Sequence, residues 1–512
     1  MKRIAIPIIS IILCQNMTAQ EKQVVNDSFY ALSPVEVKAI RAGENAPFTK
    51  TNLGKKEIAK FNLGQDIPFL LNQTPSVVIN SDAGNGIGYT GIRIRGTDAT
   101  RINMTINGIP YNDAESQGLF FVNLPDFASS VNSIQVQRGV GTSSNGAGAF
   151  GATMNFSTNE VNKTAYAEIN NSYGSFNTWK NTVKAGSGLL NDRFTVDLRL
   201  SNITSDGFID RASTDLKSFY FSTAFLGKNN SLRFNIISGK EKTYQAWNGI
   251  SEADLLAGNR TVNYAGTEKP GDPYDNEVDN YKQDHYQLFF QQLINPRLSF
   301  NTAFFLTKGK GYYEQYKADE EYAKYGLPNT GNSDFVRQLW LDNDFYGNIF
   351  SLQHKTDKAQ TTLGGAVTVY KGNHIGKIIW ASNGMPTPTH RWYDHNATKK
   401  DLNVYLKEQY QLNDRWSLFG DVQYRHVSYD IDGFRDNPSV VVNNDFNFFN
   451  PKAGVSYNRN GWKGYFSYGM ANKEPNRDDF EAGATQQPKP EKLHDFEASI
   501  ERSNSSCNWS AT

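Results

Sequence analysis

The sequence predicts a mainly β protein, in which a small N-terminal α/β domain precedes an antiparallel β-barrel that crosses a membrane. From residue 164 onward apolar and polar residues alternate, and no run of about 18 apolar residues follows the N-terminus. Aromatic residues make up 13% of the 512 residues. Because a barrel exposes only every second residue to lipid, its mean hydropathy stays low, as it does here at −0.57.

The first residues have the charge and length of a secretory signal. A basic start precedes an apolar run at residues 4–13, and the expected signal covers residues 1–19 with cleavage after Ala19. The alternative is a lipoprotein signal that is acylated at Cys14. Residues 20–45 are polar and weakly patterned, so we expect a flexible segment there.

We expect residues 46–160 to form the α/β domain. Residues 62–71 predict a short helix with one apolar side, and residues 77–79 predict a brief strand. Glycines at residues 86, 88 and 91 fit a literal G-x-G-x-x-G, but the alternating residues 92–95 that follow predict a strand instead of a helix. The motif therefore does not predict a nucleotide site, because the pyrophosphate needs a helix N-terminus there.

Residues 164–512 have the pattern of a barrel wall. Residues 194–201 alternate completely, with four apolar side chains on one face and four polar side chains on the other. Short turns alternate with long polar segments, and this asymmetry is typical of outer-membrane barrels. About 14 strands can be counted by this pattern. The long polar segments are residues 241–283, 309–347 and 372–399.

A resemblance to a known family accompanies this pattern. Residues 91–130, with Arg138-Gly139 and the glycine-rich residues 146–151 behind them, resemble the plug domain of TonB-dependent outer-membrane receptors. The resemblance implies a 22-stranded barrel that holds the plug in its lumen and imports scarce nutrients with energy passed from the inner membrane. Measured against that family, about 14 strands predict an incomplete barrel and a chain truncated within it.

A short segment ahead of the plug has an extended pattern. Alternating valines around Glu36 favour a strand, and a proline before them disfavours a helix. The resemblance implies that this segment is the TonB box, which the energy-coupling protein TonB grips; the alternative is an ordinary linker. The TonB-box-like residues are Pro34, Val35, Glu36, Val37, Lys38 and Ala39.

Plug arginines are candidates for a latch between plug and wall. The alternation predicts that Arg93 and Arg95 share one face of their strand, and buried guanidinium groups need carboxylates. The resemblance implies that Arg95 and Arg138 pair with glutamates of the inner wall. Glu497 is the best partner because it alternates with apolar neighbours. The alternative is solvated surface arginines, so the expected latch consists of Arg93, Arg95, Arg138 and Glu497.

Candidate ligand contacts lie in the plug loop at residues 112–118 and in the long polar segments. The two carboxylates of the plug loop have no nucleophile or histidine near them in sequence, so the sequence does not predict an enzyme. Histidines in residues 372–399 leave a haem role open. The candidate contacts are Asn112, Asp113, Glu115, Gln117, Tyr244, Trp247, His390 and Trp392.

The expected function is TonB-dependent import of a ferric siderophore or a haem-type iron complex across the Gram-negative outer membrane. Alternatives are import of cobalamin or an oligosaccharide, and a passive porin-like barrel. Expected partners are TonB, outer-membrane lipid and a small-molecule ligand such as an iron chelate, and we expect no cofactor and no metal site. With 52 basic and 52 acidic residues, the chain gives no electrostatic case for nucleic-acid binding.

Overall fold

The computed structural model describes residues 41–43, 46–146, 148–482 and 487–512. The described residues form three sheets of five, two and fifteen strands, which confirms the mainly β prediction. None of the described helices is long and apolar enough to cross a membrane. The predicted signal and the TonB-box-like segment lie outside the described residues.

Two small sheets build the plug. The larger has the strand order β1-β6-β7-β4-β5, in which only the β4–β7 pair is parallel, and β2 and β3 form the smaller sheet. The strands are β1 (Lys50–Gly54), β2 (Val77–Ser81), β3 (Thr90–Ile94), β4 (Ile102–Ile106), β5 (Ile109–Pro110), β6 (Ser133–Arg138) and β7 (Ala152–Ser157).

The plug helices are short. The helix predicted within residues 62–71 is limited to α3 (Ile67–Leu70), because Gly64 has a φ of 133° that a helix cannot contain. A helix that the sequence analysis did not predict, α2 (Lys55–Phe61), precedes it. The single-turn 3₁₀ helices are η1 (Ala99–Arg101), η2 (Phe121–Asn123), η3 (Phe127–Ser130) and η4 (Ser143–Asn145).

The plug core packs between its sheets and helices. On β3, Ile92 and Ile94 are buried while Arg93 is exposed, as the alternation predicts. Met104 from β4 and Met154 from β7 lie in the same cluster of buried side chains. The glycine-rich plug therefore has a continuous apolar core, and Tyr220 and Ile237 of the fifteen-stranded sheet pack into it.

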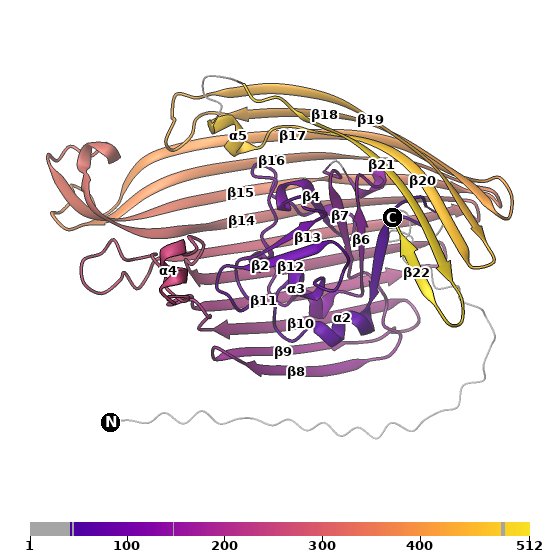
Figure 1. Ribbon diagram of the computed structural model, residues 1–512, viewed down its shortest axis with the longest axis horizontal. Coiled ribbons are helices and arrows are strands. Elements are labelled where there is room, and N and C mark those ends of the chain that lie inside the picture. The colour runs from indigo at the N-terminus through magenta and orange to yellow at the C-terminus, as the bar shows by residue number, and fades with distance from the viewer. Residues whose placement is uncertain (1–40, 44–45, 147, 483–486) are drawn as a thin grey trace. The chain divides into compact units, whose positions relative to one another are not determined.

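The fifteen-stranded sheet forms the wall, and its strands follow one another in chain order (Figure 1). Every neighbouring pair is antiparallel, and the sheet has one strand more than the count from sequence. In the described part of the chain, β8 and β22 are the two ends of the strand order. The first eight strands are β8 (Tyr166–Gly174), β9 (Thr178–Gly186), β10 (Phe194–Ser205), β11 (Thr214–Leu226), β12 (Asn230–Tyr244), β13 (Val278–Asn295), β14 (Leu298–Glu321) and β15 (Asn332–Lys355). The remaining seven are β16 (Ala359–Ala381), β17 (His390–Gln411), β18 (Trp416–Ile431), β19 (Val442–Arg459), β20 (Trp462–Lys473), β21 (Glu491–Ser503) and β22 (Asn508–Ala511).

The two faces of the wall differ in polarity. On β10, Arg199 is 2% exposed, whereas its neighbour Leu200 is 53% exposed. Arg199 and Ser201 of this strand contact Asp126 of the plug, whereas the apolar side chains at the alternate positions 194–200 are exposed. This is the arrangement expected of a barrel whose outer surface meets lipid.

Two of the predicted long loops are largely strand, which corrects the sequence analysis. Residues 309–347 fall mainly on β14 and β15, and residues 372–399 mainly on β16 and β17. Pairs of charged residues on neighbouring strands, such as Lys310 with Asp342, continue the β ladder through these segments. A polar sequence there therefore does not indicate a loop. The loop between β12 and β13 remains, with α4 (Glu252–Leu256) inside it.

Candidate functional site

A cavity of about 560 Å³ lies between the plug and the inner face of the wall. We call it the apex cavity. The plug side includes Tyr89, Tyr111, Asp113 and Glu115, and the volume is within the range of small-molecule sites. The wall side is rich in aromatic residues, including Trp247, Tyr281, Tyr313, Trp340, Tyr370 and Tyr393.

Glu115 is a plug residue of the apex cavity whose carboxylate contacts three side chains of the wall and its connections. Its carboxylate accepts hydrogen bonds from the Tyr370 hydroxyl at 2.9 Å and from Arg477 at 2.9 Å, and its Oε2 lies 2.7 Å from His374 Nε2. Burial alone would raise the pKa of Glu115, but the histidine, the arginine and the tyrosine hydroxyl outweigh it and lower the pKa to about 2. The carboxylate is therefore ionised at neutral pH.

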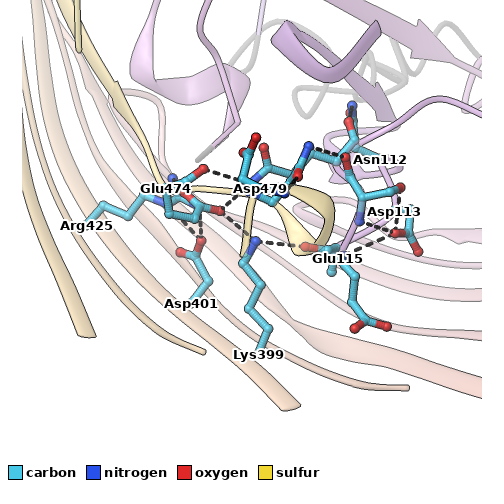
Figure 2. Close-up of polar contacts among 12 residues, drawn as sticks. Asn112, Asp113, Glu115, Lys399, Asp401, Arg425, Glu474 and Asp479 are labelled. Atoms are coloured by element: carbon cyan, nitrogen blue, oxygen red, sulfur yellow. Dashed lines mark hydrogen bonds and ion pairs between the residues drawn. The ribbon is translucent and has the colours of Figure 1, made fainter. Parts of the chain in front are cut away.

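An ionic network of residues from the wall lies beside the plug loop and contacts it (Figure 2). Lys399 of β17 donates to the carbonyl oxygen of Ala114 at 2.7 Å and pairs with Glu474 at 2.6 Å. Arg425 of β18 pairs with Glu474 and with Asp401, each at 2.6 Å. These charges are buried and compensated, so they fix the plug loop against the wall.

The segment between β20 and β21 also contacts the plug loop. Gln117 Nε2 donates to Glu474 at 3.1 Å, and the backbone N–H of Arg477 donates to the carbonyl oxygen of Glu115 at 3.0 Å. Asn476 and Asp479 cap the start of α5 (Arg477–Ala482) by reciprocal bonds of 2.9 Å. The floor of the apex cavity is thus built jointly by the plug and by a wall connection far along the chain.

Five of the eight predicted ligand contacts lie at or beside the apex cavity. Asp113, Glu115 and Trp247 line it, whereas Asn112 and Gln117 line a smaller cavity of about 150 Å³ on the other side of the plug loop, together with Asp113. The sequence analysis missed the wall residues that complete the candidate site. Alternation shows on which side of a strand a residue lies, but it does not show which plug residue that side chain contacts. The missed residues include His374, Lys399, Asp401, Arg425, Glu474 and Arg477.

Tyr244, His390 and Trp392 do not line either cavity. The Tyr244 hydroxyl donates to the carbonyl oxygen of Tyr274 at 2.6 Å, and His390 Nε2 lies 2.6 Å from the carbonyl oxygen of Tyr325. Trp392 packs edge to face on Tyr325, with ring centroids 5.1 Å apart. These three residues pack within wall strands and connections, so we leave them out of the candidate site.

The predicted latch is divided in the structure. Arg95 forms an ion pair with Glu497 of β21, although Arg95 follows β3 in a turn with a φ of 51° instead of sharing its face with Arg93. Arg138 donates to the carbonyl oxygen of Pro75 at 3.1 Å, inside the plug. Among the described contacts, neither Arg138 nor the exposed Arg93 forms an ion pair with the wall, so Arg95 alone keeps the predicted partner.

Strand β21 makes further contacts with the plug that the sequence analysis missed. Glu491 accepts two hydrogen bonds from Arg101, at 2.9 and 2.7 Å, and Asp495 accepts one from the backbone N–H of Val140 at 3.0 Å. Glu491, Asp495 and Glu497 are at alternating positions and therefore face the same side of the strand.

A second anchor joins the plug to the opposite end of the wall. Asp126 lies 2.8 Å from Lys180 of β9 and 3.3 Å from Arg199 of β10, and all three side chains are at most 2% exposed. The carboxylate also accepts bonds from Thr182 at 2.6 Å and Ser201 at 2.7 Å. Burial opposes ionisation, but Arg199 and Lys180 outweigh it and lower the pKa of Asp126.

A charge exchange tests the Arg95–Glu497 latch. We expect Arg95→Glu and Glu497→Arg to destabilise the plug separately, and the double variant to recover about 1 kcal/mol as coupling energy. The reason is that Glu497→Arg places a third guanidinium beside Arg95 and Arg138, and the positive charge of Arg95 already repels that of Arg138. Urea denaturation of the purified receptor in detergent measures the change. Single changes that add without recovery would show that the pair contributes nothing.

The fold consists of a plug that packs against an antiparallel β-sheet wall, with a cavity between the two. The model of the TonB-dependent Receptor Plug Domain matches residues 42–153, and the model of the TonB dependent receptor-like beta-barrel matches residues 244–512. The chain belongs to the TonB-dependent receptor family. Members of this family are transporters of the Gram-negative outer membrane and not enzymes, which places this chain in the outer membrane.

Solved structures share the fold. The ferric citrate transporter FecA has a TM-score of 0.68 at 16% identity, over 91% of this chain and 69% of that chain. The ferric-catecholate import receptor Fiu from E. coli K12 has a TM-score of 0.66 at 16% identity, over 93% and 73%. The copper transporter OprC has a TM-score of 0.67 at 12% identity, over 91% and 69%. No curated protein matches the chain.

Proposed function

We propose that the protein imports a ferric siderophore or a haem-type iron complex across the outer membrane with energy supplied through TonB. The observation that carries this proposal is the apex cavity, which has room for a chelate and opens onto the plug loop. Importers of ferric citrate, ferric catecholates and copper share the fold, which supports a metal-complex cargo. In this proposal residues 46–160 form the plug and residues 164–512 form the wall.

The network beneath the plug loop supports a route from ligand to plug. Glu115 contacts both the cavity and Arg477, and the adjacent Ala114 carbonyl is held by Lys399. A ligand that contacts Glu115 would therefore act on groups that fix the plug to the wall. Energised import requires such a coupling, since the plug must move for the cargo to pass.

The coupling segment gives the test of this function. Replacing Val37 with proline removes a backbone N–H that strand addition to TonB would use. We expect Val37→Pro to abolish growth on the imported nutrient while the receptor stays in the membrane. Source cells carrying the full-length receptor would be grown on media limited in turn for ferric chelate, haem, cobalamin or oligosaccharide, with uptake of the labelled nutrient as the direct measurement.

Val24→Pro is the matched control, because it makes the same substitution outside residues 33–39. It should transport as the wild type does. Loss of growth on a nutrient other than an iron complex would assign that nutrient as the cargo. Unchanged uptake by Val37→Pro would contradict the coupling segment, and uptake that persists without an energised inner membrane would favour a passive barrel.

A further inference from the structure

We infer that the imported complex carries a protonated amine or guanidinium group, which binds between Tyr89, Glu241 and Asp279 at one end of the apex cavity. We call this end the acceptor end. The inference rests on the proposed function and narrows its cargo to a cationic class. It comes from two carboxylates that no cation compensates and two amide oxygens that have no donor among the described residues.

The acceptor end is built on neighbouring wall strands. In the β12–β13 ladder, Glu241 lies opposite Tyr281, and Asp279 lies opposite Thr243, two positions along from Glu241. The two carboxylates are therefore diagonal neighbours on the face that meets the plug. Glu241 is 1% exposed and Asp279 is 9% exposed, although both line the apex cavity.

The two carboxylates are not compensated by a cation of the protein. Glu241 accepts a hydrogen bond from the Thr243 hydroxyl at 3.2 Å, and Asp279 accepts one from the Tyr89 hydroxyl of the plug. In the part of the chain that the structure describes, no lysine, arginine or histidine forms an ion pair with either carboxylate. Two buried carboxylates in one site are costly unless a positive charge or a shared proton compensates them.

Two amide oxygens at the same place also lack donors. Asn123 is 7% exposed, and its Oδ1 has no hydrogen-bond partner among the described residues; the same holds for Gln283 Oε1. Both residues line the apex cavity. Asn123 belongs to η2, whose close approach to β12 requires Gly239, because a Cβ there would lie 2.1 Å from the Asn123 carbonyl oxygen.

Gln283 lies opposite Gly239 in the ladder and on the same face of β13 as Asp279, so this amide and the two carboxylates line the same cavity beside Asn123. Buried polar atoms in folded proteins nearly always find partners. An ammonium or guanidinium offers several donors and no acceptor, and it would satisfy these acceptors. A carboxylate or phosphate of a ligand would instead be repelled by Glu241 and Asp279.

Aromatic rings complete the acceptor end. Tyr89 packs edge to face on Trp247 with ring centroids 5.4 Å apart, and Trp247 packs on Tyr313 at 6.0 Å. Aromatic faces attract a cation that has left water, with tryptophan the strongest of them. The two arginines that line the cavity form ion pairs with other carboxylates and not with Glu241 or Asp279: Arg477 pairs with Glu115, and Arg435 pairs with Asp436.

A matched pair of chelates tests the inference on the purified receptor. One probe is a ferric trihydroxamate whose chain ends in a free primary ammonium, and the other is the same chelate acetylated at that nitrogen. We expect calorimetric titration to show binding of the ammonium chelate at least tenfold more tightly, because the charged group makes charge-assisted hydrogen bonds. The double variant Glu241→Gln with Asp279→Asn should reduce this preference to about twofold or less.

Asp284→Asn is the control, since Asp284 lies on the opposite face of β13 and pairs with Lys282 at 2.7 Å. It should keep the tenfold preference. Equal binding of the two chelates by the wild type, as a carboxylate pair with a shared proton would give, overturns the inference, and so does a failure of the ammonium chelate to bind. Because titration requires no energy coupling, a preserved preference without cellular uptake would count against the proposed function alone.

Discussion

Replacing Asp126 with asparagine should lower the free energy of unfolding of the plug by about 3–5 kcal/mol. The substitution preserves the shape of the side chain but leaves Lys180 and Arg199 buried without a counter-charge, and each of them is only 2% exposed. Removing one member of a buried ionic group costs more than the group contributes, because the remaining charges stay desolvated. Urea denaturation of the purified receptor in detergent measures the change.

The effect should depend on pH in a defined direction. The pKa of Asp126 is lowered in the folded protein, because Arg199 and Lys180 outweigh the effect of burial. A carboxyl group with a lowered pKa stabilises the fold above its unfolded pKa of about 3.9, and this contribution is lost as the pH falls below that value. The difference in the free energy of unfolding between wild type and Asp126→Asn should therefore be largest at pH 7 and become smaller in acid.

Two variants separate the ionic explanation from a general packing defect. Asp98→Asn removes a plug carboxylate that pairs with Arg101, and because these two side chains are 40% and 35% exposed, the loss should be less than about 1 kcal/mol. Adding Lys180→Met and Arg199→Met to Asp126→Asn removes the stranded charges and should restore much of the stability. A loss below about 1 kcal/mol for Asp126→Asn would mean that the anchor is no stronger than a surface pair.

The wall strands could be predicted from the sequence because apolar and polar side chains alternate along a strand that has one apolar and one polar surrounding. The alternation at residues 194–201 gave both the strand and its faces, and the alternation around Glu497 identified the side chain that meets Arg95. Loops were harder to predict. Strands β14 and β16 extend through residues 309–321 and 372–381, where polar residues occupy both faces and resemble a loop.

The candidate site was predicted only on the plug side. Asp113 and Glu115 lie close together in the sequence, so one short motif identifies both. The wall partners of Glu115 come from β16 and α5, and Lys399 of β17 bonds the Ala114 carbonyl between the two acidic residues. Pairing of Glu115 with Arg477 joins residues 362 positions apart. Periodicity shows which side chains of a strand face the plug. It does not show which position along the strand lies next to a given plug residue, and that position decides which charged groups pair.

Glu115→Gln should destabilise the plug by about 3 kcal/mol at pH 7, from the difference between an ordinary glutamate pKa and the folded value of about 2. The substitution leaves Arg477, which is 12% exposed, without its counter-charge at 2.9 Å. Because the folded pKa is the lower one, the contribution is complete above a pH of about 4.3 and is lost as the pH falls toward 2. Denaturation of wild type and variant at pH 7, 4 and 2.5 measures this trend.

The neighbouring Asp113 provides a control of opposite sign. Burial, followed by the charge of Glu115, raises the pKa of Asp113 above its ordinary value. A carboxyl group with a raised pKa contributes most below its unfolded pKa and loses that contribution as the pH rises. The free energy of unfolding of Asp113→Asn, relative to the wild type, should therefore increase as the pH rises. That of Glu115→Gln should approach the wild-type value as the pH falls. If both variants changed in parallel with pH, the common cause would be a displaced plug loop and not the charge of either carboxylate.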